Sequence, residues 1–223
     1  MMSIETSKEP VMSALGSRAM LFEAPGALGL ENQQRIWALS NQVQQWSLVA
    51  EAVPGMNNLM LTFHQPPQAL EPFYDALLAE WQRGETQTLQ GRVVELPVYY
   101  GGEYGPHLCD VAQHTGLSIA EIVRRHAEPL YPVYALGSHP GYCYLGGMDP
   151  SIATPRRQTP VLSIPGGAVS IGGVQTGVSA SAGPSGWNTI GHTEFVFFDA
   201  TATPPVTLRP GDSVQFRIQK VLS

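Results

Sequence analysis

Two adjacent arginines, Arg156-Arg157, are the side chains of this sequence best suited to bind a small anion. Residues 129–191 contain only one other charged side chain, Asp149. Around the pair the chain is rich in Gly, Pro, Ser and Thr, a composition that predicts loops with accessible backbone groups. A guanidinium binds a carboxylate or phosphate through two parallel hydrogen bonds. We therefore expect a small anionic ligand in these loops.

The two arginines are not expected to point the same way. Adjacent residues of an extended segment face opposite sides, so we expect one arginine to face the ligand and the other to face a protein interface. The plainer alternative is that one of them simply faces solvent.

A second polar pair, Gln175-Thr176, lies within the glycine-rich sequence 172–177. The glycines permit close backbone approach, and the amide and hydroxyl groups can bind a planar amide or a carboxylate. The alternative is a glycine-rich β-turn with a capping threonine.

Histidine supplies the candidate proton-transfer groups. His192 precedes an apolar run and could act as a general acid or base, or orient a carbonyl; alternatively it packs at the start of a strand. His139 lies in the constrained turn 137–141. A metal site would need both histidines and either Cys143 or Asp149, but none of these pairs has a recognised metal-ligand spacing. We assign no metal ligands.

Composition limits the partners of this 223-residue chain. Charged residues make up 13% of it, against roughly 25% in typical soluble domains, so we expect burial against another chain. The alternative is a compact β-rich protein with a surface of Ser, Thr and Gln. No strongly basic stretch points to nucleic acid or an anionic membrane, and the apolar runs are too short to span a bilayer.

Lysine and cysteine usage narrows the function further. The only lysines, Lys8 and Lys220, lie near the two ends, which excludes a Walker, Schiff-base or kinase-type lysine in the folded body. Neither Cys109 nor Cys143 belongs to a CxxC pair, and residues 1–10 are too polar for a secretory signal. The reducing cytoplasm is the expected compartment.

The pattern of elements predicts an α+β fold with a boundary near residue 90. Residues 1–15 are expected to be a flexible leader, followed by domains at 16–90 and 91–223. The first half has the order β-α-β-β-α-β, which is typical of a ferredoxin-like unit. The expected strands and helices of that unit are 18–23, 32–46, 49–53, 59–64, 70–83 and 93–99.

The second half is expected to be mostly β-structure. Two short helices at 108–114 and 118–126 come first, the second with a capping box formed by Ser118 and Glu121. Short apolar runs separated by Gly and Pro turns then predict a barrel or a sandwich. Those runs are 131–136, 161–164, 168–171, 194–198, 206–208 and 213–218.

Five ordered motifs resemble the allophanate hydrolase subunit 1 family, which includes the B subunit of 5-oxoprolinase and the sporulation kinase inhibitor protein. Segments 35–37 and 52–58 also resemble that B subunit, and the resemblance covers roughly residues 16–218. The five motifs lie at 137–147, 154–157, 172–177, 186–193 and 210–216.

The resemblance implies a fold, a reaction and partners. The fold is a ferredoxin-like α/β domain followed by a cyclophilin-like β-barrel. The reaction is the ATP-dependent opening of 5-oxoproline to glutamate, at a site that is shared with a homologous C subunit and that an A subunit completes. ATP and its magnesium are expected at the complex, and the chain alone is expected to be inactive.

For such a substrate we expect catalytic roles for Arg156 on the carboxylate or phosphate, Gln175 on the lactam amide and His192 in proton transfer. Other residues are expected to bind the substrate: Arg157, Thr176, Gly173, His139, Tyr144 and Trp187. The chain departs from the family pattern at Ser138, Cys143, Ser179-Ala180 and Ser185, which implies a larger or more polar substrate, or reduced activity.

Two other functions remain open. The chain could be a regulatory module that inhibits a sensor histidine kinase, as one family member does, or it could belong to a carboxyltransferase or allophanate-processing enzyme with a biotin requirement. Retention of Gln175, Thr176 and His192 favours a role in an amide-opening enzyme, because a docking module needs none of them.

Overall fold

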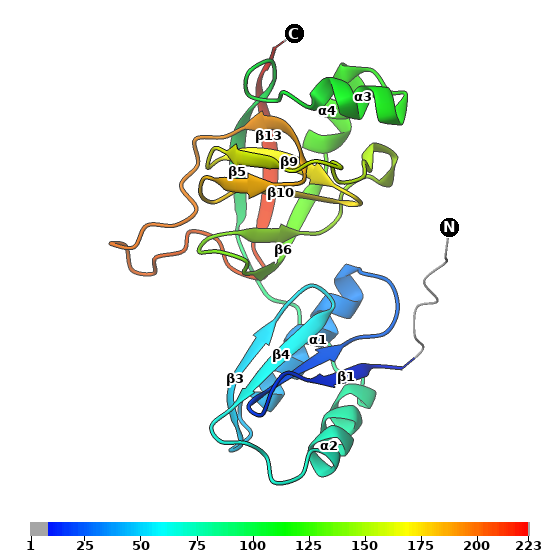
Figure 1. Ribbon diagram of the computed structural model, residues 1–223, viewed down its shortest axis with the longest axis vertical. Coiled ribbons are helices and arrows are strands. Elements are labelled where there is room, and N and C mark those ends of the chain that lie inside the picture. The colour runs from blue at the N-terminus through cyan, green and yellow to red at the C-terminus, as the bar shows by residue number, and fades with distance from the viewer. Residues whose placement is uncertain (1–8, 223) are drawn as a thin grey trace. The chain divides into compact units, whose positions relative to one another are not determined.

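The computed structural model describes residues 9–222, which form two compact units that divide between Leu89 and Gln90. The buried apolar side chains fall into two separate clusters, one in each unit. Figure 1 shows the first unit in blue to cyan and the second in green to red. Among residues 9–222, no helix is long and apolar enough to cross a bilayer.

The N-terminal unit is a four-stranded antiparallel sheet, in the order β1-β2-β4-β3, packed against two helices. Trp81 of α2 lies 5.2 Å from Phe22 of β2, measured between ring centroids, and Phe73 lies 5.1 Å from Phe63 of β4. These contacts bury the apolar stripe of the helix. The elements are β1 (Val11–Ala14), β2 (Ala19–Glu23), α1 (Leu30–Val43), β3 (Val49–Pro54), β4 (Asn58–Phe63) and α2 (Glu71–Gln82).

Two expectations for this unit are wrong. Residues 11–14, expected in a leader, pair with Met20–Glu23 as the edge strand β1, with Met12 packed against the core; residues 1–8 lie outside the described part of the chain. The strand β5 (Val93–Gly101), expected to complete the N-terminal sheet, belongs to the second unit. Its alternate side chains Leu96, Val98 and Tyr100 are fully buried in that unit's core.

The C-terminal unit is a seven-stranded sheet, in the order β10-β9-β12-β5-β13-β6-β7. Its edge strands β10 and β7 contact each other, so the sheet nearly closes into a barrel, which confirms the expected β-rich architecture. Strands β8 and β11 form a separate two-stranded sheet. The other elements are α3 (Leu108–Thr115), α4 (Ile119–Ala127), β6 (Leu130–Leu136), β7 (Cys143–Leu145), η1 (Pro150–Ile152), β8 (Val161–Ile164), β9 (Ala168–Gly172), β10 (Gln175–Val178), β11 (Gly183–Ser185), β12 (Asn188–His192) and β13 (Ser213–Leu222).

Residues 193–212 connect β12 to β13 and extend away from the barrel as a long loop, orange in Figure 1. The apolar runs at 194–198 and 206–208 were expected to be strands, but they make only one isolated bridge, between Phe198 and Val206. Phe197 is buried while its neighbour Val196 is exposed. The apolar pattern therefore reflects side chains such as Phe197 and Leu208, which anchor the loop to the core, rather than strands.

A buried imidazole ties the barrel together from the inside. His126 of α4 accepts a hydrogen bond at Nδ1 from the Tyr100 hydroxyl, at 2.8 Å, and its Nε2 lies 2.7 Å from Thr176 Oγ1. The Thr176 hydroxyl donates onward to the Ser170 carbonyl, at 3.2 Å, so Nε2 carries the imidazole proton. Burial lowers the pKa of His126 to about 3. The ring is therefore neutral near pH 7, and its bonds join α4 to β5, β10 and β9.

Replacing His126 tests this network through its pH dependence. His126→Phe leaves the buried Tyr100 hydroxyl without its partner and removes one of the two bonds of the Thr176 hydroxyl. We expect this to lower the unfolding free energy by about 1–3 kcal/mol near neutral pH. In the unfolded wild type, His126 has its ordinary pKa of 6.5, whereas in the folded protein its pKa is about 3. Wild-type stability therefore falls as the pH drops between these values, and the variant lacks this contribution.

The unfolding free energy of both proteins is measured by urea denaturation at pH 7 and pH 4.5. We expect the stability difference between wild type and His126→Phe to narrow at the lower pH. A difference of the same size at both pH values contradicts the buried neutral imidazole.

Candidate functional site

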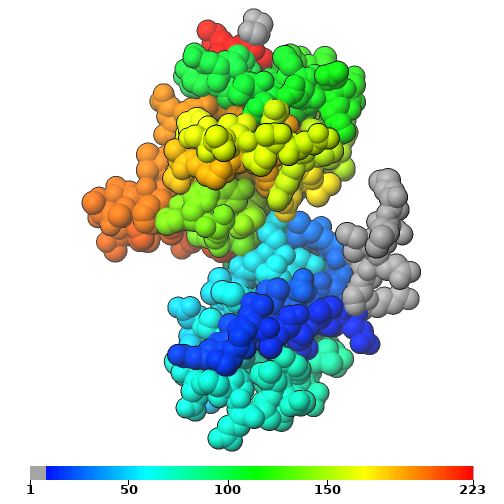
Figure 2. All heavy atoms as spheres, in the orientation of Figure 1, coloured from blue at the N-terminus to red at the C-terminus, as the bar shows by residue number. Residues whose placement is uncertain are grey.

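A cavity of about 490 Å³ in the C-terminal unit brings together four of the expected site residues: His139, Tyr144, Arg156 and Trp187. We call it the arginine cavity. The segment 150–190, yellow in Figure 2, reaches the surface on the face drawn there. Five serines contribute to the cavity wall, namely Ser138, Ser170, Ser179, Ser181 and Ser185.

Arg156 is the charged group of this cavity. It is exposed, and it forms no ion pair with any carboxylate in residues 9–222. Its guanidinium carbon lies 5.9 Å from the centre of the Trp187 ring, within the range of a cation–π contact. Burial raises the pKa of Tyr142 to about 12, and the nearby positive charge of Arg156 only partly opposes this rise. The cavity thus presents an unpaired cation beside aromatic rings.

Arg157 does not line the arginine cavity, but it lines a separate cavity of about 370 Å³ together with Arg156. Its guanidinium pairs with Asp110 of α3 at 2.9 Å, and its backbone N–H donates to the Gly186 carbonyl at 2.8 Å. The expectation that the two arginines diverge is confirmed. The substrate-binding role expected for Arg157 stays a prediction: the ion pair engages one end of its guanidinium, whereas its Nε is buried without a partner within residues 9–222.

The backbone just before Arg156 is held at Thr154 and Pro155. Thr154 and Gly173 form a backbone bridge, with N···O distances of 3.1 and 2.7 Å. The Asn188 side-chain amide donates to the Pro155 carbonyl at 2.9 Å. These bonds tie the segment to the β9–β10 hairpin and to β12, so Arg156 is positioned before any ligand arrives.

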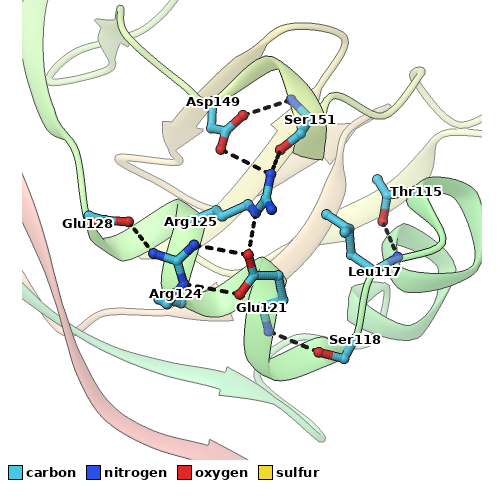
Figure 3. A network of polar contacts seen from close by, with 9 residues as sticks. All are labelled: Thr115, Leu117, Ser118, Glu121, Arg124, Arg125, Glu128, Asp149 and Ser151. Carbon is cyan, nitrogen blue, oxygen red and sulfur yellow. Dashed lines mark hydrogen bonds and ion pairs between the residues drawn. The ribbon is translucent and has the colours of Figure 1, made fainter.

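An ion-pair network fixes the preceding turn η1 to α4 (Figure 3). The Asp149 carboxylate accepts from the Ser151 backbone N–H at 2.8 Å, and Arg125 reaches both the Ser151 hydroxyl and Glu121, at 2.6 Å each. Hydrogen bonds from Arg124 and Arg125 lower the pKa of Glu121 to about 2. The network therefore stays ionised at neutral pH and anchors the chain that leads into the arginine pair.

Glycines let the protein's own aromatic rings form the cavity wall. A Cβ atom at Gly172 would lie 2.5 Å from the Trp187 ring, and one at Gly177 would lie 2.9 Å from the Tyr142 hydroxyl. The sequence suggested that these glycines admit a ligand. They instead admit Trp187 and Tyr142, which then face the ligand space.

The pair Gln175-Thr176 and Gly173 do not line the arginine cavity. The Thr176 hydroxyl is buried and bonded to His126 and the Ser170 carbonyl. Gly173 forms the bridge with Thr154. The structure therefore gives Thr176 and Gly173 positioning roles within the chain, and it leaves Gln175 in the β9–β10 hairpin outside the cavity wall.

His192 lies in a different cavity, of about 170 Å³, that shares no wall residue with the arginine cavity. Its Nε2 is 2.9 Å from the Gly166 carbonyl, and its ring stacks on Tyr104 with centroids 5.8 Å apart. The three residues expected to act together, Arg156, Gln175 and His192, are thus not brought together within this chain.

Tyr142 is a wall residue that sequence reasoning missed, whereas Ser138 lines the cavity as one of the positions where the chain departs from the family pattern. Tyr142 and Tyr144 flank the buried Cys143, so alternation along residues 142–144 was a signal that both rings share one side. Ser138 has a φ of +66°, a conformation that costs a non-glycine residue roughly 1 kcal/mol or more. Burial also raises the pKa of Cys143 to about 12, so this thiol is no nucleophile near neutral pH.

His139 lines the arginine cavity and has one ring nitrogen without a partner in the described part of the chain. Its Nε2 is buried and has no hydrogen bond within residues 9–222. Its ring lies 5.0 Å from Tyr142, which in turn lies 5.0 Å from Tyr144, measured between centroids. The three rings form a continuous aromatic wall, and a buried unsatisfied nitrogen favours a ligand that can bond it.

The family follows from a comparison of the whole chain with known proteins. Residues 10–208 match the family described as carboxyltransferase domain, subdomain C and D. The chain belongs to this family. Over 206 residues it is 41% identical to the B subunit of 5-oxoprolinase from Escherichia coli O157:H7, an alignment covering 92% of this chain and 94% of that relative. The family resemblance expected from the motifs is confirmed.

Solved structures support the fold. The crystallised protein TTHA0988 superposes with a TM-score of 0.72 at 32% identity, over 90% of this chain, which spans only 39% of that protein. The urea amidolyase of Kluyveromyces lactis superposes with a TM-score of 0.81 over 97% of this chain and 16% of its own. Its identity is 17%, so this second likeness concerns the fold alone.

Two glycines of the cavity wall make a matched test of its packing. Neither Gly177 nor Gly183 has a positive φ, but only at Gly177 would a methyl group press on Tyr142. Gly177→Ala is expected to lower the unfolding free energy by about 1–3 kcal/mol through overpacking. Gly183→Ala meets no atom within 4 Å and is expected to change it by less than about 1 kcal/mol.

Urea denaturation of the two variants under the same conditions measures these changes. Equal stability of Gly177→Ala and Gly183→Ala would show that Tyr142 does not pack against Gly177.

Proposed function

We propose that this chain is the B subunit of an ATP-dependent amidohydrolase that opens 5-oxoproline, or a related small cyclic amide, to glutamate. Three relatives that are named as the B subunit of 5-oxoprolinase, 36–41% identical to this chain, support the assignment. The observation that carries it is the unpaired Arg156 on the wall of the arginine cavity. A docking module has no need of an unpaired cation beside a ring-lined cavity.

The arginine cavity suits a small ring that carries a carboxylate. Arg156 can hold the carboxylate through two parallel hydrogen bonds, and the rings of Trp187 and Tyr144 can contact the two faces of a flat ring. His139 Nε2, which is buried without a partner among the described residues, would bond a carbonyl or an amide of the same ligand after a rotation of the ring toward the cavity. These are the groups that a carboxylated lactam presents.

The serine-rich wall favours a substrate with additional polar groups. Ser138, Ser179 and Ser185 stand at positions where the chain departs from the family pattern, and all three line the arginine cavity. Hydroxyl groups can both donate and accept hydrogen bonds. A relative of 5-oxoproline that is larger or more hydroxylated would use them.

The remaining chemistry is assigned to the complex. We place part of the active site on a homologous C subunit and further function on an A subunit, with the chain inactive alone in the cytoplasm. Within residues 9–222, no three His, Cys, Asp or Glu side chains are grouped to hold a metal ion, so magnesium is placed with ATP at the complex. Gln175 and His192 would act on the substrate of the arginine cavity only after rearrangement in that complex.

The fold assignment forms part of the same proposal. We describe the barrel as cyclophilin-like, and the N-terminal unit as ferredoxin-like with its edge strand supplied by β1 in place of a strand after α2. The sheet order β1-β2-β4-β3 supports this description of the N-terminal unit.

Arg156 is the residue to replace. In the complex purified with its A and C subunits, Arg156→Ala is expected to lower kcat/KM for 5-oxoproline-dependent ATP hydrolysis at least about 100-fold, because a charge-assisted bidentate contact is lost. Arg156→Lys should recover part of this loss, since lysine keeps the charge without the fork. The control is Arg83→Ala, which removes an exposed surface arginine of the N-terminal unit.

The assay is ATP hydrolysis coupled to glutamate formation. If Arg156→Ala kept the wild-type kcat/KM while the complex was still assembled, Arg156 would not be part of the site. A requirement for biotin, or slowed autophosphorylation of a sensor histidine kinase by the chain alone, would favour the alternative functions.

A further inference from the structure

The smaller cavity around His192 has the features of a second ligand site. It measures about 170 Å³, and its wall includes His107, His192, Tyr104 and Glu103 as well as the apolar side chains of Val161 and Ile164. We call it the histidine cavity. It shares no wall residue with the arginine cavity. Typical pockets for drug-sized ligands measure ~300–1,000 Å³, so this one suits a molecule of only a few heavy atoms.

The two imidazoles of the histidine cavity are held in the same Nε2–H tautomer, but they leave opposite ring nitrogens free. His107 Nδ1 accepts a hydrogen bond from the Thr189 backbone N–H at 2.9 Å, which leaves the proton of the neutral ring on Nε2. His192 Nε2 lies 2.9 Å from the Gly166 carbonyl, which can only accept. His192 therefore carries its proton on Nε2, and in the neutral ring its Nδ1 is an acceptor.

Neither remaining ring nitrogen is used by the protein. His107 Nε2 and His192 Nδ1 have no hydrogen-bond partner within residues 9–222. Burial lowers the pKa of His107, and the charge of Arg157 acts in the same direction. The histidine cavity thus offers one imidazole N–H donor and one imidazole acceptor.

Both rings are fixed in place before a ligand binds. The His107 backbone N–H donates to the Thr189 carbonyl at 3.0 Å, which completes a reciprocal pair of bonds with β12. The His192 ring stacks on Tyr104. A Cβ atom at Gly167 would lie 2.8 Å from His192 Nε2, so the glycine leaves room for the ring at the Gly166 carbonyl. Groups held in this way lose little entropy on binding.

We propose that the histidine cavity binds a small neutral amide, whose carbonyl accepts from His107 Nε2 and whose N–H donates to His192 Nδ1. An amide presents one acceptor and one donor side by side, and this pair matches the two nitrogens. Glu103 on the wall disfavours an anion, so this ligand differs in charge from the one expected beside Arg156. The site does not depend on the reaction assigned to the arginine cavity.

Titration of the ¹⁵N-labelled full chain with 2-pyrrolidinone tests the proposal by NMR of the imidazole nitrogens. This probe is a five-membered lactam with no carboxylate. We expect saturable shifts of His107 Nε2 and His192 Nδ1. N-methyl-2-pyrrolidinone keeps the carbonyl but lacks the N–H, and it should bind about tenfold more weakly because His192 Nδ1 then loses its partner.

Variants assign the binding to this cavity. His107→Phe and His192→Phe should each weaken 2-pyrrolidinone binding about tenfold or more, whereas Arg156→Ala, in the other cavity, should bind it as the wild type does. Circular dichroism confirms folding of each variant, and the comparison of the two lactams on the wild type needs no variant. Absence of saturation overturns the proposal, as do equal affinities for the two lactams or wild-type affinity in both folded histidine variants.

Discussion

The backbone bridge between Thr154 and Gly173 decides where the functional cation points. It ties residue 154 to the β9–β10 hairpin, and the Arg157 backbone N–H then bonds to the Gly186 carbonyl, so the backbone on both sides of Arg156 is fixed. Once Arg157 pairs with Asp110 of α3, Arg156 is left on the side of the cavity. The unpaired charge of the site is thus a consequence of backbone geometry and of one ion pair.

The aromatic walls of the arginine cavity depend on glycines at the positions that the rings pack against. Trp187 and Tyr142 occupy positions that a Cβ atom at Gly172 or Gly177 would enter. The buried His126 holds β10, which carries Gly177, through the Thr176 hydroxyl. Core polar bonds, glycine positions and aromatic walls therefore form one connected arrangement, in which a change in the core alters the ligand space.

Much of this arrangement could be predicted from the sequence. Composition and turn chemistry indicated the β-rich second half, and alternation indicated that the two arginines diverge. Local patterns could not assign β5 to a sheet, because its pairing with β13 joins residues more than 100 positions apart. Nor could they separate His192 from Arg156, or place the Thr176 hydroxyl in the core, since both depend on contacts made only by the folded barrel.

The structure partly explains why residues 129–191 contain so few charged side chains. Residues 129–191 supply the cavity walls, the barrel core and the glycines that let rings approach, and none of these roles except that of Arg156 is filled by a charged side chain.

The most direct test of the account is a structure of the co-purified complex with 5-oxoproline bound. The account predicts the ligand carboxylate about 2.7–2.9 Å from the Arg156 guanidinium, between Trp187 and Tyr144. A bound ligand that does not contact Arg156 would contradict it.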